Sequence, residues 1–293
     1  MLLKTDSPWT QLMNDTRRLQ LLGALGRYAE VLQALAELRA RMEILPESGG
    51  ADEAATPWAV REGILDTARF AAIALERWDE AISLNAEQVA SLQARGATEF
   101  EVASIRFNEC GPLLSLKRYA DAYALLIACR DAFERAGATG RLGDVFGTLA
   151  HLEDLLGHSA RAIDFAQAGL RYSYLARAVD ACAVEHFNLA NYIWRAAGSP
   201  DAAVAHRLAA VLIAFQTASG RCQSWIEALS IHLASFGNTA PPVPPSFADL
   251  CAIVERVEGV RFAELFARFP TTRAGTGDEA LHQTLALAQR KRS

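Results

Sequence analysis

Apolar side chains recur at spacings of three and four residues along most of the chain. In the stretch 100–116 they include Cys110 and Leu113, and a second series follows in the stretch 120–137. This spacing puts the apolar side chains on one face of an α-helix. The pattern therefore predicts two amphipathic helices over these stretches, joined by a turn at residues 117–119.

Runs that alternate between apolar and polar residues, which would predict strands, are rare. Valine and isoleucine are sparse, whereas alanine and leucine, both good helix formers, are abundant. The hydrophobic fraction of 51% supplies ample material for a core. The sequence therefore predicts an all-α fold.

Five short segments of the chain resemble one another. They are GRYAEVLQA at residue 26, ERWDEAISL at 76, KRYADAYAL at 117, GHSARAIDF at 157 and GSPDAAVAH at 198. The last four begin 41, 40 and 41 residues apart, and each has alanine at its sixth position: Ala81, Ala122, Ala162 and Ala203. A larger side chain at this place would push two packed helices apart, so we expect the alanines at helix–helix contacts.

A second marker has the same period. Residues 94–98 (ARGAT) are echoed by residues 135–139 (RAGAT), 41 positions later. The first interval between repeats is longer, from residue 26 to residue 76, and a polar, glycine-rich stretch led by Pro46 accounts for the excess. We interpret residues 46–55 as a loop inserted between the first two repeats.

The repeats predict three parts of the chain. Residues 1–237 form about five helix pairs, followed by a closing helix over 225–236. Residues 238–246 are a proline-rich linker, and 247–293 form a helical cap or docking segment. Two helices over 247–257 and 260–269 are expected there. Their apolar side chains should dock on the last repeat or on another chain, as a solenoid cap or as a dimer contact: Phe262, Leu265, Phe266 and Phe269.

The repeat pattern, G-x-Y or R-Y/W with alanine three residues after the aromatic, resembles the tetratricopeptide repeat family over residues 10–235. The resemblance implies a right-handed α-α superhelix of helical hairpins. The period here is longer than the usual repeat of about 34 residues, and the proline that normally ends the second helix is absent near Glu134. Such lengthened repeats resemble those of bacterial sensor and regulator proteins.

Charge and composition narrow the class of partner. The net charge is −5 and the isoelectric point is about 5.7, so broad binding to nucleic acid is not expected. No signal peptide and no membrane-spanning run is predicted. Five cysteines without a C-x-x-C pair fit free thiols in a reducing compartment. We therefore expect a cytoplasmic protein with no membrane partner.

Motifs for chemistry are missing from the sequence. It contains no phosphate-binding loop, no H-E-x-x-H zinc motif and no G-x-S-x-G nucleophile elbow. The six histidines have no metal-ligand spacing, and no base or electropositive setting accompanies the cysteines. We expect no catalytic residues, no metal and no cofactor.

The resemblance implies that the first helix of each pair lines a concave face. Residues at intervals of three, four and seven form polar stripes there, interrupted by aromatics. The partner-binding candidates are Asp66, Phe70, Ser104, Phe107, Asn108, Asp144, His151, Asp154, Glu185, Asn188, Tyr192 and Arg195. Asparagine amides can both donate to and accept from a peptide backbone, and aromatics add contact area at small entropic cost.

These stripes predict a scaffold or sensor module that binds a protein or peptide. The candidates include more carboxylates than arginines, which favours a neutral or basic segment, and they lack the basic set of carboxylate-clamp repeats. Two alternatives stay open. The stripes would be equally polar if they only faced solvent. An enzyme or small-ligand sensor would instead have a closed pocket near His151, Asp154 and Asn188.

Overall fold

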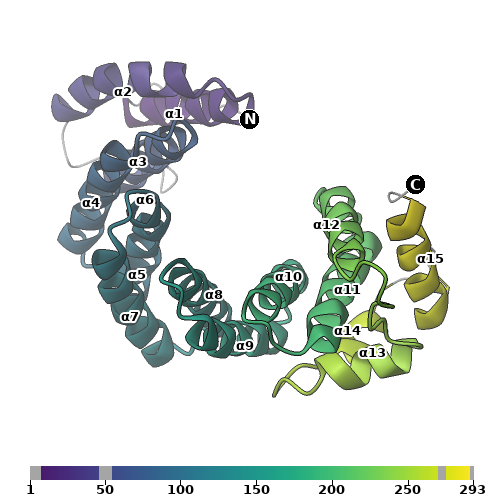
Figure 1. The fold of residues 1–293 in the computed structure, drawn as a ribbon. Coiled ribbons are helices and arrows are strands. Elements are labelled where there is room, and N and C mark those ends of the chain that lie inside the picture. Colours follow the sequence, from purple (N-terminus) through teal and green to yellow (C-terminus); the bar gives the residue numbers. More distant parts are fainter. Residues whose placement is uncertain (1–7, 46–54, 270–274, 291–293) are drawn as a thin grey trace. The chain divides into compact units, whose positions relative to one another are not determined.

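The computed structural model describes residues 8–45, 55–269 and 275–290, and within these ranges the chain forms helices and no strand (Figure 1). The helices pack in consecutive pairs, which confirms the predicted all-α fold of helical hairpins. The hand of the superhelix stays a prediction. Tertiary contacts divide the chain into two compact units, with the division between Ala132 and Phe133.

Unit 1 is a set of hairpins, and the apolar faces of its first two hairpins share one core. Trp9 and Leu12 of its first helix belong to the same buried cluster as Val60 and Ile64 of its third. Its elements are α1 (Pro8–Ala24), α2 (Tyr28–Glu43), α3 (Pro57–Ala74), α4 (Trp78–Ala94), α5 (Glu99–Arg106), the 3-10 turn η2 (Phe107–Glu109), α6 (Cys110–Ser115) and most of α7 (Tyr119–Arg135). The predicted insertion lies outside the described residues, apart from Ala55.

Unit 2 begins with the end of α7 and continues the same pattern of hairpins. Its elements are α8 (Thr139–Leu155), α9 (Ser159–Leu175), α10 (Val179–Arg195), α11 (Pro200–Gln216), α12 (Cys222–Ala234), α13 (Phe247–Val254), α14 (Phe262–Phe266) and α15 (Gly277–Arg290). Within this unit α8, α10 and α12 form one row of helices, and α9 and α11 form the other (Figure 1). The first helices of successive pairs therefore share one face.

The repeat marker coincides with the start of every second helix. Tyr28, Trp78, Tyr119, Ser159 and Pro200 are the first residues of α2, α4, α7, α9 and α11. The alanine three residues later is 0% or 1% exposed in each of the last four, at Ala81, Ala122, Ala162 and Ala203. The expectation that these alanines lie at helix–helix contacts is confirmed.

Most helices of the repeats end in the same type of turn. The amide of Arg77 donates to the carbonyl of Ala72, and the amide of His158 donates to that of Glu153, both at 2.9 Å. The preceding residues, Glu76 and Gly157, have positive φ angles of 56° and 78°. This is the Schellman arrangement, which satisfies carbonyls that the helix end leaves without a partner.

The first helix of the third pair is not continuous, so the prediction of one helix over 100–116 was wrong. The 3-10 turn η2 separates α5 from α6. Pro112 explains the interruption, because proline has no amide hydrogen and its ring collides with the carbonyl of the residue four positions earlier, here Asn108. Periodicity alone does not reveal this interruption, because the apolar spacing continues across Pro112.

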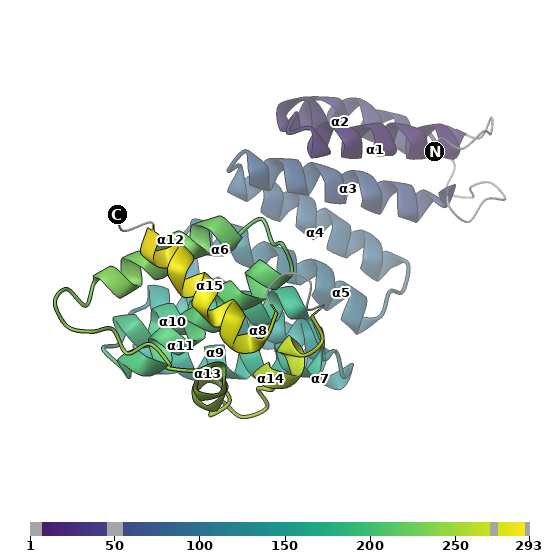
Figure 2. The same ribbon diagram turned by 90° about the vertical axis from the view of Figure 1, so that its right-hand side faces the viewer.

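Helix α11 is buried on all sides. Every residue from Ala203 to Ala214 is buried, including His206 and Arg207. It contacts α10 and α12 of the repeats, and α13 and α15 of the C-terminal segment. Within unit 2, α15, drawn in yellow, lies in front of the repeat helices in Figure 2. A helix that is apolar around its whole circumference requires such cover.

The C-terminal helices dock on the repeats of their own chain. Phe262, Leu265 and Phe266 are buried in the same core cluster as α10 and α11, and Phe269 packs against it. The helices are shorter than predicted, since α13 ends at Val254 and α14 covers only Phe262–Phe266. Gly259, with φ of 82°, turns the chain between them. The predicted domain boundaries at 237 and 246 stay a prediction.

None of the helices in the described part of the chain is long and apolar enough to cross a membrane.

Exchanging alanine and glycine at two equivalent turns tests the turn geometry. We expect Gly157→Ala to lower the free energy of unfolding by about 1 kcal/mol, because a Cβ meets nothing within 4 Å and only the left-handed backbone is disfavoured. Ala197, which ends α10 with φ of 49°, should respond in the opposite sense. Ala197→Gly should raise stability by at most about 1 kcal/mol. Urea denaturation measures the free energy of unfolding of both variants. Changes of the same sign in the two variants would contradict the explanation from the positive φ angle.

Enlarging the recurring alanine tests the helix contact. Ala162→Leu should lower the free energy of unfolding by about 1–3 kcal/mol, because the site is fully buried and an added isobutyl group cannot be accommodated. The control is Ala160→Leu, an exposed position on the same helix, which should change stability by less than about 0.5 kcal/mol. Equal losses of stability in the two variants would show that Ala162 has no special role in helix packing.

Candidate functional site

The row formed by α8, α10 and α12 in unit 2 carries stacked aromatic side chains and buried polar groups without a hydrogen-bond partner among the described residues. Along α10 they run around the helix from the side that faces α8 to the side that faces α12. Glu185 and Tyr192 lie toward α8, whereas Phe187 and Trp194 lie toward α12. We call this surface the α8–α10–α12 face.

Three glycines bring α8 and α9 close together under Glu185. An added Cβ on Gly143 would lie 3.1 Å from the Ser173 hydroxyl oxygen, and one on Gly169 would lie 3.1 Å from the backbone nitrogen of Gly147. A Cβ on Gly147 would collide with the carboxylate of Glu185. Because these glycines of α8 and α9 have no side chain, they leave the space that the Glu185 carboxyl group occupies.

Glu185 is a buried acid, and no basic side chain in the described part of the chain forms an ion pair with it. The residue is 7% exposed, and its Oε2 atom has no hydrogen-bond partner among the described residues. Burial, with a smaller contribution from the charge of Asp144, raises the pKa of this carboxyl group to about 8. At pH 7 the protonated form therefore dominates, and Glu185 adds little negative charge to the face.

The other two carboxylates of the face are paired. Arg195 of α10 forms an ion pair with Asp154 of α8, which ties the two first helices together. Arg141 and Asp144 lie one turn apart on α8, and Nη1 of Arg141 lies 3.2 Å from Oδ2 of Asp144. The excess of carboxylates expected from the sequence is therefore neutralised on this part of the chain, and the charge argument for a basic partner loses its support here.

An aromatic cluster covers the side of α10 that faces α12. Trp194 lies 4.5 Å from His232 and 5.4 Å from Phe236, measured between ring centroids. Phe187 stacks on Trp225 at 4.8 Å. Trp194 is 40% exposed, so part of the cluster is open to solvent.

Arg207 extends from buried α11 into this cluster. Its guanidinium lies 4.4 Å from the ring centroid of Phe187, and Nη2 donates to the Asn191 side-chain oxygen at 2.6 Å. The residue is only 5% exposed, yet no described carboxylate pairs with it and its Nε atom has no hydrogen-bond partner there. Burial, helped by the charge of Arg195, lowers the pKa of Arg207 to about 10, so it stays a cation at pH 7.

His232 is the second polar group of the cluster without a partner. It is buried, and neither ring nitrogen has a hydrogen-bond partner in the described part of the chain. Burial, followed by the charge of Arg207, lowers its pKa to about 4, so the ring is neutral. A buried polar atom without a partner is costly, which makes this cluster suited to supplying hydrogen bonds to a bound group.

The predicted site residues of unit 2 lie together on α8 and α10, and they differ in exposure. Tyr192 is 4% exposed and Glu185 is 7% exposed, so both side chains are enclosed in this structure. Asn188 is half-buried and His151 is exposed. Of the predicted residues in unit 2, Asp144, His151, Asn188 and Arg195 keep side chains that solvent can reach.

The predicted site residues of unit 1 lie on α3, α5 and η2. Asp66 is exposed and pairs with Arg69 at 2.5 Å, while Phe70 is exposed and meets Tyr28 edge-on at 6.0 Å. The remaining three are half-buried, two of them within the 3-10 turn: Ser104, Phe107 and Asn108.

Several residues of the face were missed from the sequence although a signal existed. Trp225, Leu229, His232 and Phe236 follow one another at intervals of four, three and four, which places them on one stripe of α12 and its end. Arg207 stands in an otherwise apolar run from 202 to 215, beside one histidine. A charge inside such a run indicates a buried group with a specific task.

Neither the cysteines nor the histidines gather into a reactive site. All five cysteines are free, and burial raises the pKa of the Cys182 and Cys251 thiols to about 12, which disfavours the nucleophilic thiolate. In the described ranges no group of three or more His, Cys, Asp or Glu side chains is placed to hold a metal ion.

Comparison with known proteins supports the fold and leaves the function open. No protein-family model matches the chain, and none of the curated proteins matches it. The crystal structure of BtubC (BKLC) from P. vanneervenii is similar over 76% of this chain and 80% of that chain, with a TM-score of 0.50 and 14% identical residues. At this identity the likeness shows the fold alone.

Glu185 should make stability depend on pH. Its pKa of about 8 in the folded chain exceeds the ordinary value of 4.5, so folding retains a proton that the unfolded chain releases. The stabilising contribution is complete at acidic pH and is lost as pH rises through about 8. Glu185→Gln, which cannot titrate, should be more stable than the native chain at pH 8.5 by about 1–3 kcal/mol. Urea unfolding at pH 5 and 8.5 measures this, and the control is the exposed Asp164→Asn on α9, which should keep the pH dependence of the native chain. A pH dependence in Glu185→Gln equal to that of the native chain would contradict the explanation.

Proposed function

We propose that this protein is a tetratricopeptide-like binding module and that the α8–α10–α12 face holds an extended segment of a protein partner. The observation that carries the proposal is Arg207, a buried cation beside a partly exposed aromatic cluster and without a carboxylate partner in the described chain. Burying an unpaired charge is unfavourable for folding alone. A bound group that pairs with it would offset this cost.

The chemistry of the face favours a segment with an apolar anchor. The exposed part of Trp194, next to His232 and Phe236, offers aromatic surface for one large side chain. Asn188 can both donate to and accept from a peptide backbone. On the next turn of α10, the amide nitrogen of Asn191 can donate, while its oxygen accepts from Arg207. Because Arg207 is positive and the carboxylates are paired or protonated, a neutral segment, or one with a carboxylate near its anchor, fits better than a basic one.

A regulatory scaffold or sensor role follows from the resemblance of the repeats to the tetratricopeptide family. A cytoplasmic location follows from the cysteine usage, and the missing motifs indicate no cofactor; both are part of the proposal. The C-terminal helices act in it as a cap, since their phenylalanines are buried against their own chain. Nothing around His151 favours the small-ligand alternative. Its side chain is exposed, and neighbouring Asp154 is engaged by Arg195.

A random peptide library displayed on phage, selected on the immobilised full chain, tests the proposal. Selected peptides would be synthesised and their affinities measured by fluorescence anisotropy. Trp194→Ala should weaken binding by about tenfold or more, as truncation of a central aromatic anchor does. Arg207→Met should weaken it similarly while leaving the melting temperature unchanged or higher, because an apolar side chain of similar length replaces an uncompensated charge.

The matched control is Trp58→Ala, which removes a half-exposed tryptophan from α3 of unit 1 and should leave binding unchanged. Selection of no peptide above background, or equal losses in all three variants, would contradict the assignment of this face. A lower melting temperature in Arg207→Met would show that the guanidinium serves the fold.

A further inference from the structure

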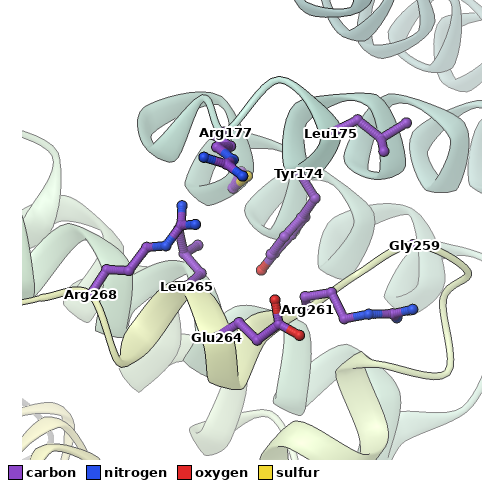
Figure 3. A pocket seen from close by; sticks show the side chains of 9 residues that line it. Tyr174, Leu175, Arg177, Gly259, Arg261, Glu264, Leu265 and Arg268 are labelled. Atoms are coloured by element: carbon purple, nitrogen blue, oxygen red, sulfur yellow. The ribbon is translucent and has the colours of Figure 1, made fainter.

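A second concave site lies in unit 2, between the α9–α10 turn and the C-terminal segment. It is a pocket of about 320 Å³ whose walls include Tyr174, Cys182 and Leu265 (Figure 3). Its size is sufficient for a small organic molecule. The pocket is separate from the α8–α10–α12 face, because different residues line it.

The charged groups of this pocket are unevenly placed. Arg177 and Arg268 lie at one end, whereas Arg261 and Glu264 lie at the other, with the Tyr174 ring between them (Figure 3). The lining carries three arginines and one glutamate, and no described acid forms an ion pair with Arg177 or Arg268. In a chain with net charge −5, this leaves two adjacent positive charges in one hollow.

Buried hydrogen bonds hold the aromatic wall in position. The Tyr174 hydroxyl lies 2.9 Å from Nε2 of His186, and Nδ1 of His186 lies 2.8 Å from Nδ1 of His206. Burial lowers the pKa of both histidines, that of His206 to about 4, so both are neutral. The hydroxyl can then donate to His186, which donates in turn to His206. Because this chain orients the ring, no ordering of Tyr174 is required when a ligand binds.

Arg177 occupies a position where earlier repeats have glycine. It has a positive φ of 55° at the end of α9, whereas the corresponding residues at the ends of α4 and α7 are Gly96 and Gly137. Glycine would be less strained there. The arginine is therefore kept at a small cost to the backbone, on the rim of the pocket.

We propose that this pocket binds a phosphate monoester carried on an aromatic or apolar body. A phosphate monoester carries a charge of about −1.5 to −2 at pH 7, which matches the two unpaired guanidinium groups better than one carboxylate does. Arginine forks bond to phosphate oxygens in pairs. The apolar body would lie on the Tyr174 ring and on Leu265.

Ligand-observed NMR at constant ionic strength tests this with phenyl phosphate as the probe, and with inorganic phosphate and benzoate as comparisons. Phenyl phosphate should bind the full chain with a dissociation constant of about 1 mM or lower. It should bind about tenfold more tightly than either comparison, because phosphate lacks the ring and benzoate lacks the second charge.

The variant Arg177→Gly with Arg268→Gln should weaken phenyl phosphate binding about tenfold or more. Its melting temperature should be retained, since glycine suits the left-handed turn. A control with the same loss of charge, Arg18→Gln with Arg77→Gln on exposed positions of unit 1, should bind like the native chain. Equal weakening in both double variants, equal affinity for phenyl phosphate and inorganic phosphate, or no binding of phenyl phosphate up to about 10 mM would overturn the proposal.

Discussion

The close approach of neighbouring helices at small residues is the constraint on which unit 2 depends. Ala162 and Ala203 are fully buried near the start of α9 and α11, and Gly143 and Gly169 let α8 and α9 come together through their backbones. Core packing leaves no room for a larger side chain at such contacts. The hairpin spacing then determines which residues of the first helices can meet.

The arrangement of the repeat helices also explains why the C-terminal segment covers α11. Helix α11 has apolar residues on all sides, so the two rows of the repeat cannot bury it alone, and α13 and α15 complete its surroundings. This cover has two consequences for binding. It buries His206 and Arg207 in the middle of α11, and it places α14 opposite the α9–α10 turn, which creates the pocket with two unpaired arginines.

Electrostatics on the α8–α10–α12 face are decided by pairing and burial. Asp154 joins Arg195, Asp144 joins Arg141, and burial keeps Glu185 protonated near neutral pH. The charge that remains without an opposite partner among the described residues there is the cation of Arg207. Buried charges without an opposite partner are rare in folded proteins and often have a functional role. This is why the face supports the proposed function.

The sequence by itself determined the helical class, the 40–41-residue period, the start of every second helix and the burial of the recurring alanines, because these follow from local spacing and residue size. It did not reveal the break at Pro112, since a helical period continues across it. Only the tertiary structure decided that Tyr192 and Glu185 are enclosed and that Arg207 reaches the aromatic cluster. Burial and pairing depend on what neighbouring helices contribute, and the spacing along one helix contains no information about those neighbours.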